Sequence, residues 1–145
     1  MMNTEALFEK SYQRVIGQGV GITERGQVFF AQFYENFFKS SEQVPEKFAN
    51  TDMEKQVRML QKGMYQLITF YLTKSESENL RSIAHTHDAH HYGIEPALYD
   101  LWLASLLQTV EELDPEYCPE LRLAWEIVMS PGILYMKFHY QAQNK

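Results

Sequence analysis

The sequence predicts an all-α protein with seven or eight helices, on three observations. Apolar residues recur every three or four positions along most of the chain, the spacing that places side chains on one face of an α-helix. No segment shows the two-residue alternation of a half-buried strand, and Gly or Pro residues separate the periodic segments. Because 145 residues are enough to bury one core, we expect a single domain over residues 1–145.

The first third of the chain predicts two helices and a short third one. A helix is expected over about 4–16, where Gly17 ends it, and another over about 23–39. A short helical segment is expected over about 44–48. The inward face of the second helix is strongly aromatic, formed by Phe30, Phe33, Tyr34, Phe37 and Phe38.

Two capping-box patterns predict where the central helices begin. Thr51 is followed by Glu54, and Ser75 by Glu78, the spacing that satisfies free amide donors at a helix start. The first of these helices is expected to run to about residue 72. The second should carry the histidines until Gly93 ends it in a left-handed or strained conformation.

Prolines predict the start of the last two helices. Pro96 and Pro119 suit the first turn of a helix, where a missing amide hydrogen costs nothing. We expect the helix that begins at Pro96 to reach about residue 110, and the last helix to reach about residue 140. Pro131 and Gly132 are expected to interrupt and kink the last helix, because an internal proline removes one hydrogen bond and crowds the preceding turn.

The composition narrows the classes of function. A formal net charge of −6 argues against a nucleic-acid partner, which requires a basic surface. The single cysteine, Cys118, excludes an internal disulfide and fits a reducing compartment. The first residues form no basic, apolar leader and no apolar run approaches about 18 residues, so we expect a cytoplasmic protein with no membrane partner. Aromatic residues make up 14% of the chain and could wall a large flat ligand.

Four of the five histidines lie within seven residues: His85, His87, His90 and His91. Only His87 continues the apolar face that precedes it, and it is therefore expected to point inward, whereas His85 is expected to face solvent. A buried imidazole needs a partner, which is usually a carbonyl, a carboxylate, water or a metal. The residue pattern alone leaves these alternatives open.

A zinc site is one of these alternatives. His87 and His91 have the i, i+4 spacing of two ligands on one helix. Zinc, however, usually takes three or four ligands from converging elements. Asp88 and the distant His139 could be recruited, and Cys118 is the only thiol, but the spacing requires none of them.

Polar residues on inward faces and the motifs around them resemble one protein family. The motifs follow in the order Phe33-Tyr34, Pro45-Glu46-Lys47-Phe48, Gln56-x-x-x-Leu60, Ile83-Ala84-His85-Thr86-His87 and Ile94-Glu95-Pro96-x-x-Tyr99. This order resembles the bacterial single-domain haemoglobins and the haem domain of flavohaemoglobins, over about residues 27–136. The resemblance implies a globin fold around a haem pocket.

The resemblance also implies a cofactor and the residues that hold it. Haem b would lie between the long helix and the histidine helix, with His87 as the proximal iron ligand. His90 and His91 are the competing ligands, and in many relatives the ligand lies two residues closer to the position of Ile94. The other haem contacts implied by position are Phe48, Leu60 and Tyr99.

On the opposite, distal side the resemblance places two hydrogen-bond donors, Tyr34 and Gln56. A phenol or amide donor stabilises oxygen more than carbon monoxide, because coordinated oxygen acquires more negative charge. Tyr99 matches a flavohaemoglobin tyrosine whose partner is a glutamate on the last helix. Here the sequence departs from the family, because no Asp or Glu follows Glu126.

The resemblance implies reversible oxygen binding for transport or storage. Oxygen, nitric oxide and carbon monoxide are the expected ligands. Nitric oxide dioxygenation would require a separate reductase, since no flavin domain follows before Lys145. The alternatives are a haem-based gas sensor and a non-haem, zinc-binding or interaction protein.

Overall fold

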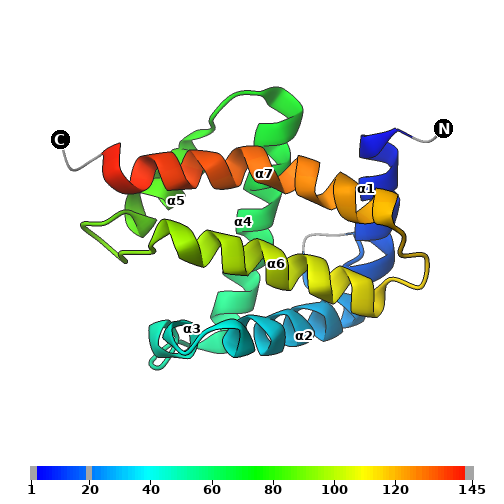
Figure 1. Ribbon diagram of the computed structural model, residues 1–145, viewed down its shortest axis with the longest axis horizontal. Coiled ribbons are helices and arrows are strands. Elements are labelled where there is room, and N and C mark those ends of the chain that lie inside the picture. The colour runs from blue at the N-terminus through cyan, green and yellow to red at the C-terminus, as the bar shows by residue number, and fades with distance from the viewer. Residues whose placement is uncertain (1–2, 19–20, 143–145) are drawn as a thin grey trace.

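The computed structural model describes residues 3–18 and 21–142, which form seven α-helices and no strand (Figure 1). The predicted all-α class is therefore confirmed. The helices are α1 (Thr4–Val15), α2 (Glu24–Ser40), α3 (Gln43–Lys47), α4 (Met53–Thr73), α5 (Glu78–His87), α6 (Pro96–Leu113) and α7 (Pro119–Ala142). None of the helices in these ranges combines the length and the apolar character needed to cross a lipid bilayer.

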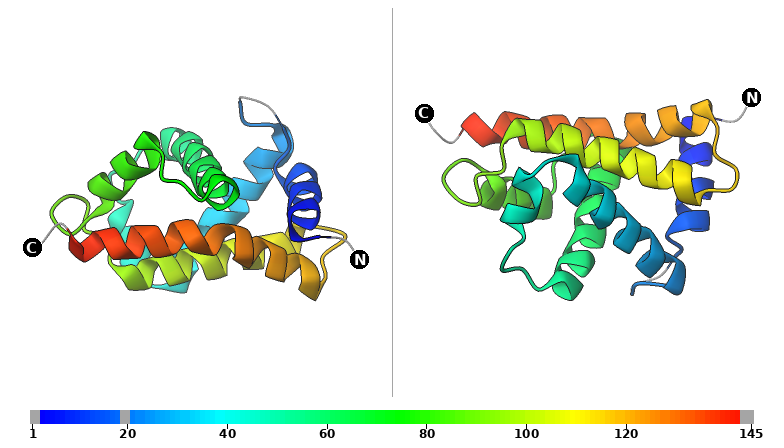
Figure 2. Two further views of the ribbon diagram at one scale, coloured as in Figure 1. Left: turned by 90° about the horizontal axis from the view of Figure 1, so that it is seen from above. Right: turned by 60° about the horizontal axis from the view of Figure 1, so that its bottom comes forward.

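The helices pack in crossed layers. Helices α2, α6 and α7 lie side by side, and α4 crosses behind them (Figure 1). Seen from above, α4 and α5 lie together on one side of α7 (Figure 2, left). The centre of the core is aromatic, and its largest fully buried side chains are Trp125, Phe29, Phe30 and Phe33.

Most helix ends lie within one or two residues of their expected positions. Thr23 caps α2 by accepting a hydrogen bond from the Gly26 amide, and Pro96 is the first residue of α6. Gly17 follows the end of α1 with φ of 92°, a conformation that residues other than glycine rarely adopt. Helix α6 extends to Leu113, a few residues beyond its expected end.

The residues that cap α4 and α5 differ from those of the predicted capping boxes. Asp52, and not Thr51, caps α4 by accepting hydrogen bonds from the amides of Glu54 and Lys55. Ser77, and not Ser75, caps α5 by accepting one from Leu80. Both boxes sit beside a second residue that can cap a helix equally well, so the spacing to glutamate does not identify the cap.

The expected helical extent of the histidine segment is wrong. Helix α5 ends at His87, and residues 88–92 form a turn. Asp88 leaves the helical conformation with ψ of 177°, and its carboxylate accepts a hydrogen bond from the His90 amide at 2.9 Å. Gly93, with φ of 63°, closes this turn and donates its amide hydrogen to the Asp88 carbonyl. The left-handed glycine was predicted correctly, but it ends a turn and not the helix.

The helix is not interrupted at Pro131, contrary to expectation, because α7 continues through Pro131 and Gly132 to Ala142. The kink expected at this proline stays a prediction. A proline inside a helix costs about 3 kcal/mol. Val128, Met129 and Ile133 are buried on either side of it, and this burial offsets the cost.

Candidate functional site

A cavity of about 200 Å³ lies among the helices. Its walls come from α2, α3, α4, α5, α6 and α7. All six residues that the sequence singled out line this one cavity: Tyr34, Phe48, Gln56, Leu60, His87 and Tyr99. Positions that span 66 residues of sequence thus converge on a single site.

His87 is the last residue of α5 and is half-buried in the cavity wall. Its Nδ1 lies 2.8 Å from the carbonyl oxygen of Ile83, one helical turn earlier, so Nδ1 carries the hydrogen and donates it. Burial lowers the pKa of His87, and the hydrogen bond to Ile83 opposes that effect only partly. The ring is therefore neutral near pH 7, with an unprotonated Nε2.

The turn after α5 brings Ile94 back to His87. The Ile94 amide donates a hydrogen bond to the His87 carbonyl at 3.1 Å, and both residues line the cavity. The two additional residues between the expected ligand and Ile94 are accommodated in the turn of residues 88–93. His87 and Ile94 therefore meet at the cavity wall.

Tyr34 contributes a phenol from α2. It is 6% exposed and packs against aromatic neighbours, with the Phe48 ring centroid 5.7 Å away. Burial raises the pKa of Tyr34 to about 12, although the Gln56 side chain lowers it somewhat through a hydrogen bond. The phenol therefore keeps its proton at neutral pH and can donate it to a ligand. Gln56, from the first turn of α4, adds an amide to the same part of the cavity.

Phe48, Leu60 and Tyr99 complete the predicted set. Phe48 packs on Phe37 and Phe38 from α2, and Leu60 follows Gln56 by one turn of α4. Burial raises the pKa of Tyr99, which comes from the first turn of α6. All three side chains are partly buried against the core.

The remaining walls are almost wholly apolar. Helix α7 contributes Ile133 and Met136, and α6 adds Leu98 and Trp102. Among the residues described as lining the cavity, Lys47 is the one with a charged side chain. The sequence pattern did not identify Lys47 as a site residue, although it lies within the quoted Pro45–Phe48 motif.

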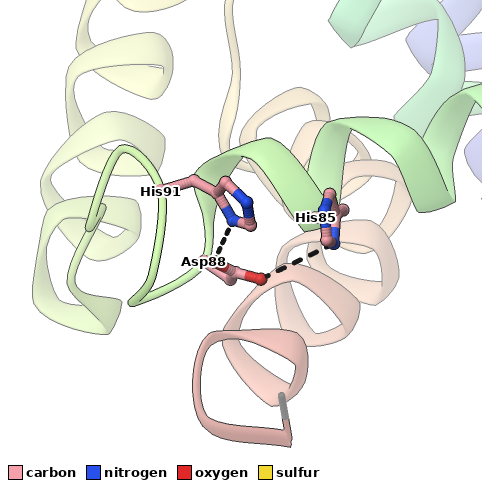
Figure 3. Close-up of side chains that lie close together, drawn as sticks. All are labelled: His85, Asp88 and His91. Atoms are coloured by element: carbon pink, nitrogen blue, oxygen red, sulfur yellow. Dashed lines mark hydrogen bonds and ion pairs between the residues drawn. The ribbon is translucent and has the colours of Figure 1, made fainter. Parts of the chain in front are cut away.

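The other clustered histidines lie outside the cavity walls. His85, His90 and His91 are exposed, as expected for His85. His91 Nδ1 lies 2.7 Å from Asp88 Oδ1, and His85 Nδ1 lies 3.8 Å from Asp88 Oδ2 (Figure 3). His87 and His91 do not share a helix, because α5 ends at His87, so the zinc pair suggested by their spacing is not formed in that way.

A solved structure places this geometry in a family. No family model matches the sequence, and no curated protein matches it. The crystal structure of a Pseudomonas aeruginosa PAO1 protein, described as structurally highly homologous to a human haemoglobin, superposes with a TM-score of 0.83. The two sequences are 34% identical over 95% of this chain and 98% of that one. The chain belongs to the globin family.

The predicted globin fold is therefore confirmed, as is the resemblance to bacterial haemoglobins. In this globin both α4 and α5, the two helices between which the resemblance implied a haem, line the cavity. The sequence pattern did not predict that Asp88 is buried, because an aspartate that follows a helix is ordinarily exposed to solvent.

Proposed function

We propose that this globin binds haem b in the cavity, with His87 as the proximal ligand, and that it binds oxygen reversibly. The observation that carries the proposal is the hydrogen bond between His87 Nδ1 and the Ile83 carbonyl. This bond fixes the tautomer and the orientation of the ring and leaves Nε2 to coordinate a metal. When bound, haem would supply an iron able to bind a diatomic gas.

The cavity walls fit a haem in three respects. They are largely apolar, as the face of a porphyrin requires. A neutral imidazole lies on α5, while a protonated phenol and an amide approach from α2 and α4. Lys47 adds a cation that could pair with the carboxylates at the edge of the cofactor.

We propose binding and not oxygen activation as the main activity, because the partner of His87 is a neutral carbonyl. A carboxylate partner makes a coordinating imidazole more basic and a stronger electron donor, whereas a backbone carbonyl does so less. Helix α7 contributes the apolar residues Ile133 and Met136 to the cavity, in keeping with the missing glutamate. Nitric oxide dioxygenation remains a secondary proposal, for which the same distal donors, Tyr34 and Gln56, would be used.

The test is to replace histidines one at a time and measure haem content. His87→Ala should remove or grossly weaken haem binding, seen as loss of the Soret band and of haem in a pyridine extract. His90→Ala and His85→Ala are matched controls, since both side chains are exposed and outside the cavity walls. A normal spectrum in His87→Ala together with haem loss in His90→Ala would overturn the ligand assignment.

Reversible oxygen binding is tested separately on the reduced protein. Exposure to air should give an oxygen spectrum that reverts under vacuum, and carbon monoxide should displace it. A protein that holds haem but whose reduced iron takes up neither gas would overturn the proposed function while leaving the haem site intact.

A further inference from the structure

A buried carboxylate lies beside the proposed haem site but outside the cavity walls. Asp88 is 1% exposed, and its Oδ1 accepts hydrogen bonds from the His90 amide at 2.9 Å and from His91 Nδ1 at 2.7 Å. Its Oδ2 is buried and has no hydrogen-bond partner among the described residues. A buried charged oxygen without a partner is costly, and such an atom commonly marks a missing cation or water.

Two imidazoles lie next to each other beside this carboxylate, with ring centroids 4.3 Å apart (Figure 3). His85 comes from the last turn of α5 and His91 from the turn that follows it, while Asp88 lies between them in sequence. One nitrogen of each histidine and one Asp88 oxygen all lie within 4.8 Å of one another. The imidazoles are exposed, so an ion could reach them from solvent, and Asp88 forms the floor of the site.

We propose that His85, Asp88 and His91 bind a divalent transition-metal ion of the zinc class. Two imidazole nitrogens and one carboxylate oxygen form a donor set that zinc uses in proteins, with water filling the remaining position. The hard ions Mg²⁺ and Ca²⁺ prefer all-oxygen ligands and should bind poorly.

The geometry requires only small adjustments to close around an ion. Zinc bonds of about 2.0–2.1 Å place tetrahedral ligand atoms roughly 3.3 Å apart. The present separations are at most 4.8 Å, so none of them must change by more than about 1.5 Å. Rotation of two exposed imidazoles can supply this movement. His91 Nδ1 now donates its hydrogen to the Asp88 carboxylate. On metal binding this hydrogen would move to Nε2 of the same ring, which leaves the Nδ1 lone pair for the metal.

The site is distinct from the proposed iron site. His87 lines the cavity, whereas His85, Asp88 and His91 do not. The metal would join the end of α5 to the turn that brings Ile94 back to His87, and it would therefore hold the backbone on both sides of the proposed haem ligand. Zinc should raise the midpoint of thermal unfolding, because a ligand that binds only the folded state stabilises it.

The experiment measures zinc binding to the full chain by equilibrium dialysis with elemental analysis, and by calorimetry. Wild type should bind one zinc per chain. His85→Ala, His91→Ala and Asp88→Asn should each weaken binding at least tenfold, and should abolish the zinc-dependent rise in the unfolding midpoint. His90→Ala is the matched control, because its side chain is exposed and only its backbone amide contacts Asp88.

Circular dichroism shows whether each variant is folded. His85→Ala and His91→Ala remove exposed side chains and should therefore fold, so the test still stands if Asp88→Asn, which changes a buried residue, does not fold. Zinc binding retained in both His85→Ala and His91→Ala, or lost in His90→Ala, would overturn the proposal. So would binding of Mg²⁺ as tightly as zinc, or no stoichiometric zinc at all. The proposed function rests on the haem site, and a His91→Ala protein that loses zinc binding but keeps a normal Soret band would show that zinc binding and haem binding are independent.

Discussion

Burial strengthens the preference of His87 for the neutral imidazole and of Tyr34 for the protonated phenol. Burial lowers the pKa of a histidine and raises that of a tyrosine, because in each case the charged form is disfavoured. The wall of the cavity therefore presents an electron-pair donor on α5 and a hydrogen donor on α2 at the same pH. These are the two chemical functions that a gas-binding haem site needs from its protein.

Tyr34→Phe should speed oxygen dissociation, because it removes the donor best placed to stabilise a partly charged ligand. Loss of a hydrogen bond to a charged acceptor costs about 1.5–3 kcal/mol, which corresponds to roughly ten- to a hundredfold in rate. Carbon monoxide release should change less. Stopped-flow dissociation of both gases measures the effect.

Tyr99→Phe is the matched control for that measurement. It also removes one phenol from the cavity wall, but Tyr99 comes from α6 and matches a proximal position of the family. Its effect on oxygen dissociation should be small. Equal rates for wild type and Tyr34→Phe would show that the phenol does not reach the ligand, and Gln56→Leu would then be measured as the remaining donor.

Helices α4 and α7 cross at Gly132, which has almost no room for a side chain. A Cβ atom at Gly132 would overlap the Leu67 side chain and would lie 3.3 Å from the Leu67 Cα. Leu67 and Ile133, which follows Gly132 in the chain, line the cavity. The close approach of the two backbones therefore sets the width of one wall of the site.

Gly132→Ala should lower the free energy of unfolding by about 1–3 kcal/mol, because the added methyl group overpacks this crossing. A double-mutant cycle with Leu67→Ala identifies the cause. In the Leu67→Ala background the terminal atoms of the leucine are gone, so Gly132→Ala should cost less. Additive effects in urea unfolding would mean that the two residues do not clash.

Across the molecule, the end opposite α5 is held by a buried polar network. Asp114, which caps α6, accepts hydrogen bonds from Ser11 and Arg14 of α1, and Ser11 in turn accepts one from the indole of Trp125 on α7. Three helices distant in sequence are thus joined at one carboxylate. Such networks specify how helices dock, because any other arrangement leaves a buried charge unpartnered.

This network should make the stability of the protein depend on pH. Burial alone raises the pKa of Asp114, but hydrogen bonds from Arg14, Ser11 and the Glu116 amide outweigh it, and the net pKa is lowered. A carboxyl with a depressed pKa in the folded state stabilises the fold above its unfolded pKa and loses that contribution as pH falls through the folded pKa.

Asp114→Asn should therefore reduce the free energy of unfolding near pH 7 by about 1–3 kcal/mol. The difference from wild type should shrink as pH falls below the ordinary carboxyl pKa of 3.8. Urea unfolding of both proteins at several pH values checks this. A difference that stays constant down to the lowest pH at which the protein is folded would contradict it.

The sequence was a good guide wherever the controlling interaction is local. Helical periodicity identified the seven helices of the described residues, and Gly17 and Pro96 marked ends because caps and turn residues act within a few positions of themselves. The six predicted site residues came from ordered motifs, and all of them line one cavity. Their roles toward haem and gas remain predictions, as does the single-domain organisation.

What the sequence by itself determined is therefore the all-α class, most of the inward face of the second helix and the protein family. The tertiary structure decided two kinds of question. One is which of two neighbouring residues caps a helix, and the other is where a helix ends when a segment distant in sequence packs against it. The tertiary structure selected Asp52 and Ser77 as caps, carried α7 through Pro131 and ended α5 at His87. At the last of these sites the Ala89 amide donates to the Tyr140 carbonyl of α7, and Asp88 is buried. Such burial depends on surfaces more than 50 residues away in sequence, and no short pattern around an aspartate encodes it.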